Sequence, residues 1–189
     1  RCPTLVLAEG AGALVLEDWE HARARGARVY AELAGFGESC DRVNLVRPDR
    51  DGQARALRAA MADAGLQPAQ VDYVNAHATG TREGDAVEVA ALVAVLGEHA
   101  PGVAVSATKS ALGHPLGAAG ALEAVATVLA LHHGAIPPTL GSAADLDPAC
   151  AGVAHVFGAA RRGAALRAAL SNSFAFGGSN AVLAFRATA

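Results

Sequence analysis

Hydrophobic and polar positions follow two different periods along the chain, and the two periods alternate. Short apolar or alternating runs predict strands at residues 13–17, 28–37, 71–76, 103–105, 153–157, 165–170 and 181–185. Apolar residues at helical spacing predict helices at residues 19–25, 53–64, 83–96 and 118–133. Strands and helices interleave in the middle of the chain, which favours parallel pairing there, while the last two strands indicate a hairpin. The pattern therefore predicts one α/β domain over residues 1–189.

Composition permits a well-packed core and argues against two classes of partner. Hydrophobic residues make up 52% of the chain and aromatic residues only 4%, so the core is expected to consist mainly of Ala, Val and Leu. The net charge of −3 and the scattered basic residues leave no footprint for nucleic acid. The longest apolar stretch, residues 118–131, is interrupted by Gly120 and Glu123 and is shorter than the roughly 18 residues of a membrane span. We expect neither nucleic acid nor a membrane as a partner.

The cysteines and the first residues indicate a cellular setting. Cys2, Cys40 and Cys150 are odd in number, widely separated and not at metal-ligand spacing. No signal peptide is expected, because Glu9 breaks the first apolar run and no cleavage site follows it. These features favour a reducing, cytoplasmic setting with no disulfide framework and no metal. Because the chain starts at Arg1 rather than Met, we expect it to be part of something longer.

Three polar turns follow predicted strands, where open α/β sheets collect their ligands. They are His77-Ala-Thr-Gly-Thr81, Lys109-Ser-Ala-Leu-Gly-His114 and Asn172-Ser-Phe-Ala-Phe-Gly-Gly178. Imidazoles suit proton transfer and hydrogen-bond donation near neutral pH, so two histidines on separate turns, with a lysine before the second, suggest catalysis. The competing interpretation is structural, because a single histidine at a strand end most often only bonds its neighbours.

Other polar residues also allow two interpretations. Thr79 and Thr81 either bind a ligand or bond their own backbone. Glu123 either pairs with Lys109 inside the protein or faces the one wet stripe of its helix, and the pattern alone slightly favours the wet stripe. Cys40 has no histidine or lysine near it in sequence, which disfavours a reactive thiol. The remaining histidines are expected on the surface; they are His21, His99, His132, His133 and His155.

Taken together, the three turns resemble motifs of the β-ketoacyl-acyl-carrier-protein synthases. Residues 75–81, followed by Gly84, Asp85 and Glu88, resemble the first histidine motif of that family. Residues 106–114, followed by residues 116–123, resemble the second histidine motif.

Two further segments extend the resemblance over essentially the whole chain, in matching order and spacing. Residues 172–180 resemble the family's C-terminal Phe-Gly-Gly loop, and residues 8–17 resemble the strand that opens the second half of its fold. Within the family, Asn75 and the Pro115-Leu116 pair resemble the sequences of discrete fatty-acid elongation enzymes and type II polyketide synthases.

The resemblance implies a fold and a reaction. The fold would be thiolase-like, with two similar layered α/β halves, of which this chain would be the C-terminal half. The reaction would be a decarboxylative Claisen condensation of an acyl thioester with malonyl-acyl-carrier protein, in fatty acid or polyketide synthesis. No metal or organic cofactor is implied. The substrates would be carried on the phosphopantetheine of acyl carrier protein, which would be the partner.

The resemblance also assigns roles to residues. His77 and His114 would donate hydrogen bonds to the malonyl thioester oxygen as enolate charge develops, and His77 would also assist decarboxylation. Lys109, paired with Glu123, would orient the site and bias its charge. Binding roles fall on the remaining motif residues: Thr79 and Thr81 would contact the pantetheine arm, Phe176 would gate acyl entry beside Phe174, and Gly177 and Gly178 would be the hinge.

The chain departs from the family pattern at the nucleophile. That residue is a cysteine at the N-terminus of a buried helix in the N-terminal half, and Cys40 and Cys150 are expected in loops away from the catalytic motifs. We therefore expect the isolated chain to be inactive. It would be active only together with its missing half or with another synthase chain. The alternative is a truncated synthase or a non-catalytic partner subunit. Homodimerisation stays open, a bare apolar face is expected, and Ala175, where Gly is usual, is expected to stiffen the gate.

Overall fold

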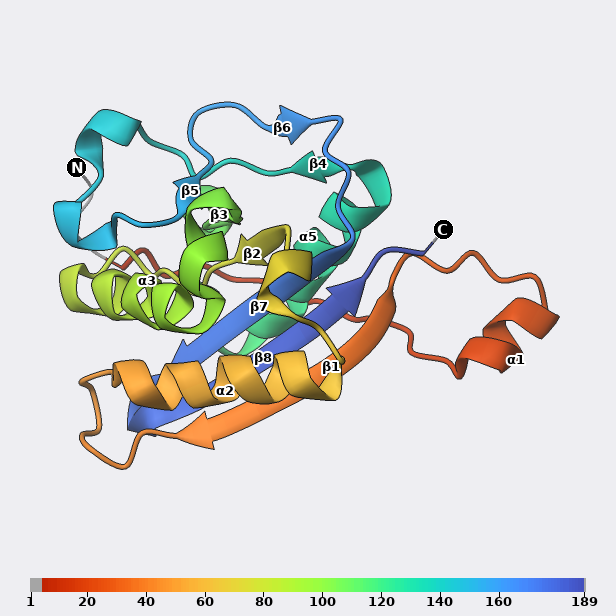
Figure 1. Cartoon of the computed structure of the whole chain (residues 1–189), viewed down its shortest axis with the longest axis horizontal. Coiled ribbons are helices and arrows are strands. Elements are labelled where there is room, and N and C mark those ends of the chain that lie inside the picture. The colour runs from red at the N-terminus through yellow and green to blue at the C-terminus, as the bar shows by residue number, and fades with distance from the viewer. Residues whose placement is uncertain (1–4, 189) are drawn as a thin grey trace.

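A six-stranded mixed sheet forms the centre of the protein, with helices on both of its faces (Figure 1). The structure is a computed structural model, and it describes residues 5–188. The sheet order is β1-β8-β7-β2-β3-β5. Its strands are β1 (Glu32–Cys40), β2 (Tyr73–Asn75), β3 (Ala104–Ser106), β5 (Ala154–His155), β7 (Ala168–Ala175) and β8 (Ser179–Arg186). Two residues each of β4 (Ala135–Ile136) and β6 (Arg161–Arg162) form a separate small sheet.

The direction of the strands divides the sheet into two regions. β2 pairs in parallel with both β7 and β3, and β3 pairs in parallel with β5. β8 is antiparallel to β7 on one side and to β1 on the other. The expected parallel pairing in the middle of the chain and the expected final hairpin are both confirmed.

Helices cover the two faces of the sheet and create two apolar cores. The helices are α1 (Trp19–Ala24), α2 (Arg50–Asp63), α3 (Arg82–Leu96), α4 (Lys109–Leu112) and α5 (Ala119–His133). Successive side chains of a strand point to opposite faces, so Val74 packs in the core under α2 and α3, whereas Tyr73 packs in the core under α5. α1 stands apart from the sheet, at the end of an extended segment (Figure 1).

The chain passes very close to α2 along β1. A Cβ atom at Gly37 would lie 2.2 Å from the carbonyl oxygen of Ala56 and 2.3 Å from the backbone nitrogen of Ala60. Real Cβ atoms do not approach backbone atoms that closely. Glycine at this position therefore permits the strand and the helix backbone to touch.

Several predicted elements differ from the structure. The strand expected at residues 13–17 is wrong, because that segment is extended but pairs with no strand among the described residues. The strand expected at 28–37 lies further along the chain, as β1. Residues 171–175, expected to be part of a polar turn, belong to β7, and the turn is only Phe176–Gly178. The polar turn expected from Lys109 to His114 begins with the short helix α4.

One apolar segment is longer than the sequence pattern suggested. Leu116–His133 has a mean hydropathy of 1.3, and it is long and apolar enough by those measures alone to cross a membrane. The expectation that no stretch reaches this length is therefore wrong. Core helices pass the same test, and α5 within this segment packs against β7 and β2 through residues such as Ala124 and Leu131.

Candidate active site

The histidine-bearing turns meet at one edge of the sheet. β2 and β3 are parallel neighbours, so the segments that follow them leave the sheet at the same edge and bring His77 close to the Lys109–His114 turn. The rings of His77 and His114 lie 5.4 Å apart between centroids, at an interplanar angle of 86°. Phe174, near the end of the neighbouring strand β7, has its ring centroid 6.2 Å from that of His77. The two predicted histidines are thus brought together.

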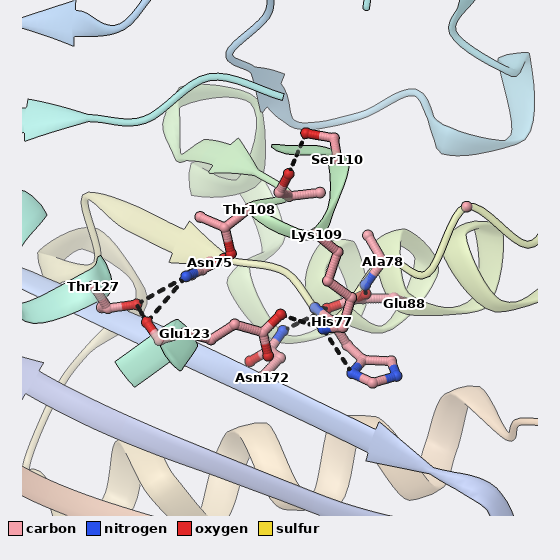
Figure 2. Close-up of polar contacts among 12 residues, drawn as sticks. Asn75, His77, Ala78, Glu88, Thr108, Lys109, Ser110, Glu123, Thr127 and Asn172 are labelled. Carbon is pink, nitrogen blue, oxygen red and sulfur yellow. Dashed lines mark hydrogen bonds and ion pairs between the residues drawn. The ribbon is translucent and has the colours of Figure 1, made fainter. Parts of the chain in front are cut away.

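A buried ion pair between Lys109 and Glu123 lies beside His77 (Figure 2). Lys109 is 7% exposed and Glu123 is 2% exposed, and the Lys109 Nζ donates a short hydrogen bond to Glu123 Oε1. The same Nζ lies 3.3 Å from Nδ1 of His77. Of the two interpretations of Glu123, the pairing with Lys109 is confirmed and the wet stripe is wrong.

Burial and the nearby ammonium keep both imidazoles neutral. Burial, with smaller contributions from Lys109 and His114, lowers the pKa of His77 to about 3. Burial and Lys109 also lower the pKa of His114. Burial raises the pKa of Glu123 to about 7, although the ammonium of Lys109 opposes this change. At neutral pH the site therefore presents two uncharged imidazoles beside the Lys109–Glu123 pair.

The contact with Lys109 fixes the tautomer of His77. An ammonium group has only donors, so Nδ1 of His77 must act as the acceptor in the 3.3 Å contact with Lys109. A neutral imidazole that accepts at Nδ1 carries its proton on Nε2. His77 is therefore set to donate a hydrogen bond from Nε2.

Glu88 is a supporting residue that the sequence analysis named only as part of a motif. Its carboxylate accepts hydrogen bonds from the backbone N–H groups of His77 and Ala78, both at 2.9 Å, and from Nδ2 of Asn172 at 2.8 Å (Figure 2). Burial raises the pKa of Glu88. The available signal was its position, because Glu88 shares the buried side of α3 with Leu92, one helical turn later.

Asn75 is a second supporting residue, and it joins three elements. Its Nδ2 donates to the backbone carbonyl of Glu123 at 3.1 Å and to Oγ1 of Thr127 at 3.2 Å, both on α5. Its Oδ1 accepts from Oγ1 of Thr108, just before α4, at 3.2 Å. The fully buried amide thus connects β2 with the helices that carry Lys109 and Glu123.

A cavity of about 880 Å³ opens beside this cluster. Of the predicted site residues, Lys109, His114, Thr79 and Thr81 line it. His77 and the Phe-Gly-Gly turn are not among the residues that line the cavity. Thr79 and Thr81 also bond each other, with their hydroxyl oxygens 3.2 Å apart. Their contact with a pantetheine arm stays a prediction.

The Phe-Gly-Gly turn lies at the end of β7, and its parts differ in exposure. Phe174 is buried, whereas Phe176 is 73% exposed. Gly177 has φ 81° and Gly178 has φ 73°, which glycine adopts easily. The N–H of Gly177 donates to the carbonyl of Leu45 at 2.7 Å, which ties the turn to the loop after β1. Gating by Phe176 stays a prediction, as does stiffening by Ala175.

The described cysteines lie closer to these motifs than expected. Cys40 ends β1, and its thiol donates to the carbonyl of Gly177 at 3.7 Å. Cys150 lines the cavity beside Lys109 and His114. The expectation that both lie away from the motifs is therefore wrong, and Cys2 lies outside the described residues.

Neither described cysteine has the setting of an activated nucleophile. A helix N-terminus lowers a thiol pKa, but Cys40 ends a strand and Cys150 ends a 3₁₀ turn. Burial raises the pKa of Cys150 to about 11, so this thiol is protonated at neutral pH.

Most of the other histidines are exposed. His21, His99, His132 and His133 are exposed as expected, but His155 is partly buried, and its Nε2 lies 2.8 Å from the carbonyl oxygen of Cys150. Within residues 5–188, no cluster of three or more His, Cys, Asp or Glu side chains is arranged to hold a metal ion.

Comparison with known proteins agrees with this geometry. Residues 30–143 match the family described as beta-ketoacyl synthase, C-terminal domain. The chain is 50% identical over 182 residues to "Nodulation protein E" of Rhizobium sp. (strain N33), covering 96% of this chain and 44% of that protein. It is 47% identical over 184 residues to the mitochondrial 3-oxoacyl-[acyl-carrier-protein] synthase of Arabidopsis thaliana, covering 95% of this chain and 40% of that protein.

Solved structures give the same result. "The ishigamide ketosynthase/chain length factor" superposes with a TM-score of 0.92 at 43% identity, covering 99% of this chain and 48% of that chain. A type II polyketide synthase acyl-carrier protein in complex with its ketosynthase, AntDE:AntF, gives a TM-score of 0.86 at 33% identity, covering 92% of this chain and 42% of that chain.

The extent of these matches defines which part of the family fold is present. The chain spans less than half the length of the curated relatives it matches. The matched residues include both histidine-bearing turns, Lys109 and Glu123. The chain therefore belongs to the β-ketoacyl synthase family and is the C-terminal part of its thiolase-like fold.

Proposed function

We propose that this chain supplies the decarboxylation and enolate-stabilising half of a β-ketoacyl synthase active site, acting in fatty acid or polyketide synthesis. The observation that carries the proposal is the pair of neutral imidazoles, whose ring centroids lie 5.4 Å apart, with the Lys109–Glu123 pair in contact with His77. Two neighbouring neutral imidazoles can each donate an N–H hydrogen bond to an oxygen on which negative charge develops.

The proposed reaction assigns each group a step. The malonyl thioester loses carbon dioxide, and the electrons of the broken carbon–carbon bond move into the thioester as an enolate. The N–H groups of His77 and His114 donate to the enolate oxygen. The enolate carbon then attacks the acyl thioester, a carbon–carbon bond forms, and the cysteine thiolate leaves. Lys109 acts on His77 by holding Nδ1 as an acceptor, so that Nε2 is the donor.

The acyl chain needs a cysteine outside the described residues, because neither Cys40 nor Cys150 has the setting of an activated thiol. We infer that another part of a complete synthase contributes it. One similar structure is a ketosynthase in complex with its acyl-carrier protein, which supports acyl carrier protein as the substrate carrier here. A non-catalytic partner subunit is the competing role, and the complete His–Lys–His–Glu set argues against it.

A chimaera tests the proposal. The matched segment of the Arabidopsis mitochondrial synthase, to which this chain is 47% identical, is replaced by this chain. Ketoacyl product and carbon dioxide from malonyl- and acyl-carrier protein are measured by mass spectrometry. We expect condensation by the chimaera and a loss of at least about 100-fold in His77→Ala and in His114→Ala.

The matched control is His21→Ala, which removes an exposed imidazole from α1 and should leave the rate unchanged. A folded chimaera that binds acyl-carrier protein but forms no product would overturn the catalytic assignment and favour the partner subunit. Carbon dioxide release without ketoacyl product would limit this chain's contribution to decarboxylation.

A further inference from the structure

The main chain at His114 is held by a segment more than 100 residues away in sequence. The backbone N–H of His114 donates to the carbonyl of Val6 at 2.7 Å, and the N–H of Ala8 donates to the carbonyl of His114 at 3.1 Å. Together these two bonds form an isolated parallel bridge between Leu7 and His114. Neither bond uses the N–H of Leu7, which lies between the two bonding residues.

The loop that carries His114 has an unusual backbone. Gly113 has φ 74°, and Leu116 has φ 47°, although Leu116 is not a glycine. Non-glycine residues rarely adopt positive φ, and they keep it only where the surroundings impose it. The loop is also close to the bridging segment, because a Cβ atom at Gly113 would lie 2.7 Å from Cβ of Ala8. The segment therefore braces a loop with two left-handed residues.

The His114 side chain has few polar restraints of its own. Its Nδ1 is buried and has no hydrogen-bond partner among the described residues. His77 differs, because Lys109 contacts its ring nitrogen and Glu88 accepts from its backbone N–H. The direction of the His114 imidazole consequently depends on how its main chain is held.

We propose that Val6–Ala8 is a positioning strap for His114, which fixes the second imidazole through the Val6 carbonyl and the Ala8 N–H. The catalytic consequence rests on the proposed function, because a misplaced His114 would lose its share of enolate stabilisation. Leu5, Val6 and Ala8 also line the cavity. Loss of the strap would therefore open one wall of the cavity. It would also release His114, one of the two imidazole donors of the site.

The strap is tested by NMR on the 189-residue chain, without turnover. Ala8→Pro removes the N–H that donates to His114, whereas Ala8→Gly keeps it and is the conservative control. Leu7→Pro is the positional control, because the bridge does not use that N–H. The measurements are hydrogen exchange of the His114 amide and the ring signals of His114 as pH is varied.

In Ala8→Pro we expect the His114 amide to exchange about tenfold faster or more, while exchange at Leu170 in β7 stays unchanged. The pKa of the His114 ring should rise in that variant, because burial and Lys109 hold it low in the intact site. Ala8→Gly and Leu7→Pro should match the parent chain. The same exchange and pKa in Ala8→Pro as in the parent chain would overturn the proposal.

The parent chain alone gives a second test, which holds even where Ala8→Pro fails to fold. A His114 amide that exchanges as fast as an exposed amide would exclude the strap. In the chimaera, Ala8→Pro should lower kcat and leave KM for acyl-carrier protein unchanged. A chimaera that is inactive with Ala8 intact would contradict the proposed function. It would not contradict the strap, which the NMR measurements test separately.

Discussion

At the scale of single residues, the site depends on buried polar groups that exchange water for several fixed hydrogen-bond partners each. Glu88 gives its oxygens to two backbone N–H groups and one amide, and Asn75 spans from β2 to α4 and α5. Such groups are costly to bury unless they are satisfied, so each one restricts where its neighbours can lie. Burial in this framework, together with the ammonium of Lys109, keeps both imidazoles neutral.

The low pKa of His77 predicts a particular pH dependence. The folded-state pKa of about 3 lies below the unfolded value near 6.5, so below pH 6.5 only the unfolded chain takes up this proton. Stability from neutral His77 is therefore fully present above pH 6.5 and declines as pH falls towards 3. Urea unfolding between pH 6 and 4.5 should show this loss, at a slope of about 1.4 kcal/mol per pH unit.

His77→Gln isolates this contribution from those of the carboxylates. The variant has no imidazole to protonate, so its stability should fall less steeply with pH than that of the parent chain. Equal slopes for the two chains would mean that His77 is protonated as easily in the folded protein as in the unfolded one.

At the scale of elements, the sequence predicted most helices and the parallel centre, and the errors have physical causes. Residues 171–175 are expected in a turn, because Ser and Asn are rare in buried strands. In the structure Ser171 and Asn172 are buried in β7, and Asn172 donates to Glu88. The prediction of a strand at 13–17 is wrong for a different reason. The apolar pattern there is typical of a strand, but no described strand pairs with the segment.

The candidate site is only partly predictable from the sequence, because the pattern does not show which residues tertiary packing brings together. His77, Lys109 and His114 sit on short turns whose residue types are visible in sequence. The partnership of Lys109 with Glu123 depends on α5 packing across the sheet edge, and the hydropathy pattern alone does not show that geometry. Glu88 and Asn75 support the site from inside an otherwise apolar helix and strand, where periodicity assigns no function.

The contact of β1 with α2 makes Gly37 a sensitive position. A methyl group there would meet the backbone of Ala56 and Ala60, which cannot move without distorting α2. We expect Gly37→Ala to lower the free energy of unfolding by about 2–4 kcal/mol, measured by urea denaturation.

Gly102→Ala is the matched control, because nothing lies within 4 Å of a Cβ atom at that position. The control should stay within about 0.5 kcal/mol of the parent chain. A Gly37→Ala variant as stable as Gly102→Ala would contradict the close contact of β1 and α2.

At the scale of the whole molecule, the extended segment before α1 presents apolar side chains to solvent. Val15 is 88% exposed and Leu16 is 68% exposed, in a run that carries a strand-like pattern. Exposed apolar strands without partners promote association. The bare apolar face expected from the sequence stays a prediction, and Val15 and Leu16 are candidate members of it.

This exposure predicts concentration-dependent association of the chain. Leu16→Glu should reduce it, since a charge at that position makes burial against a second surface costly. Light scattering over a concentration series is the measurement. Ala24→Glu adds the same charge at an exposed position of α1 and should leave association unchanged. Equal association of all three chains would place the contact elsewhere.

The position of β8 in the sheet also determines the order in which the protein can be completed. β8 lies between β1 and β7, yet among the described residues it is the last strand in the sequence. β1 therefore leaves the ribosome long before its partner exists, and its edge stays open until residues 179–186 follow. A premature stop near residue 178 would remove an interior strand rather than a tail. The newly made chain consequently exposes that edge of β1 to pairing with other chains until residues 179–186 have emerged.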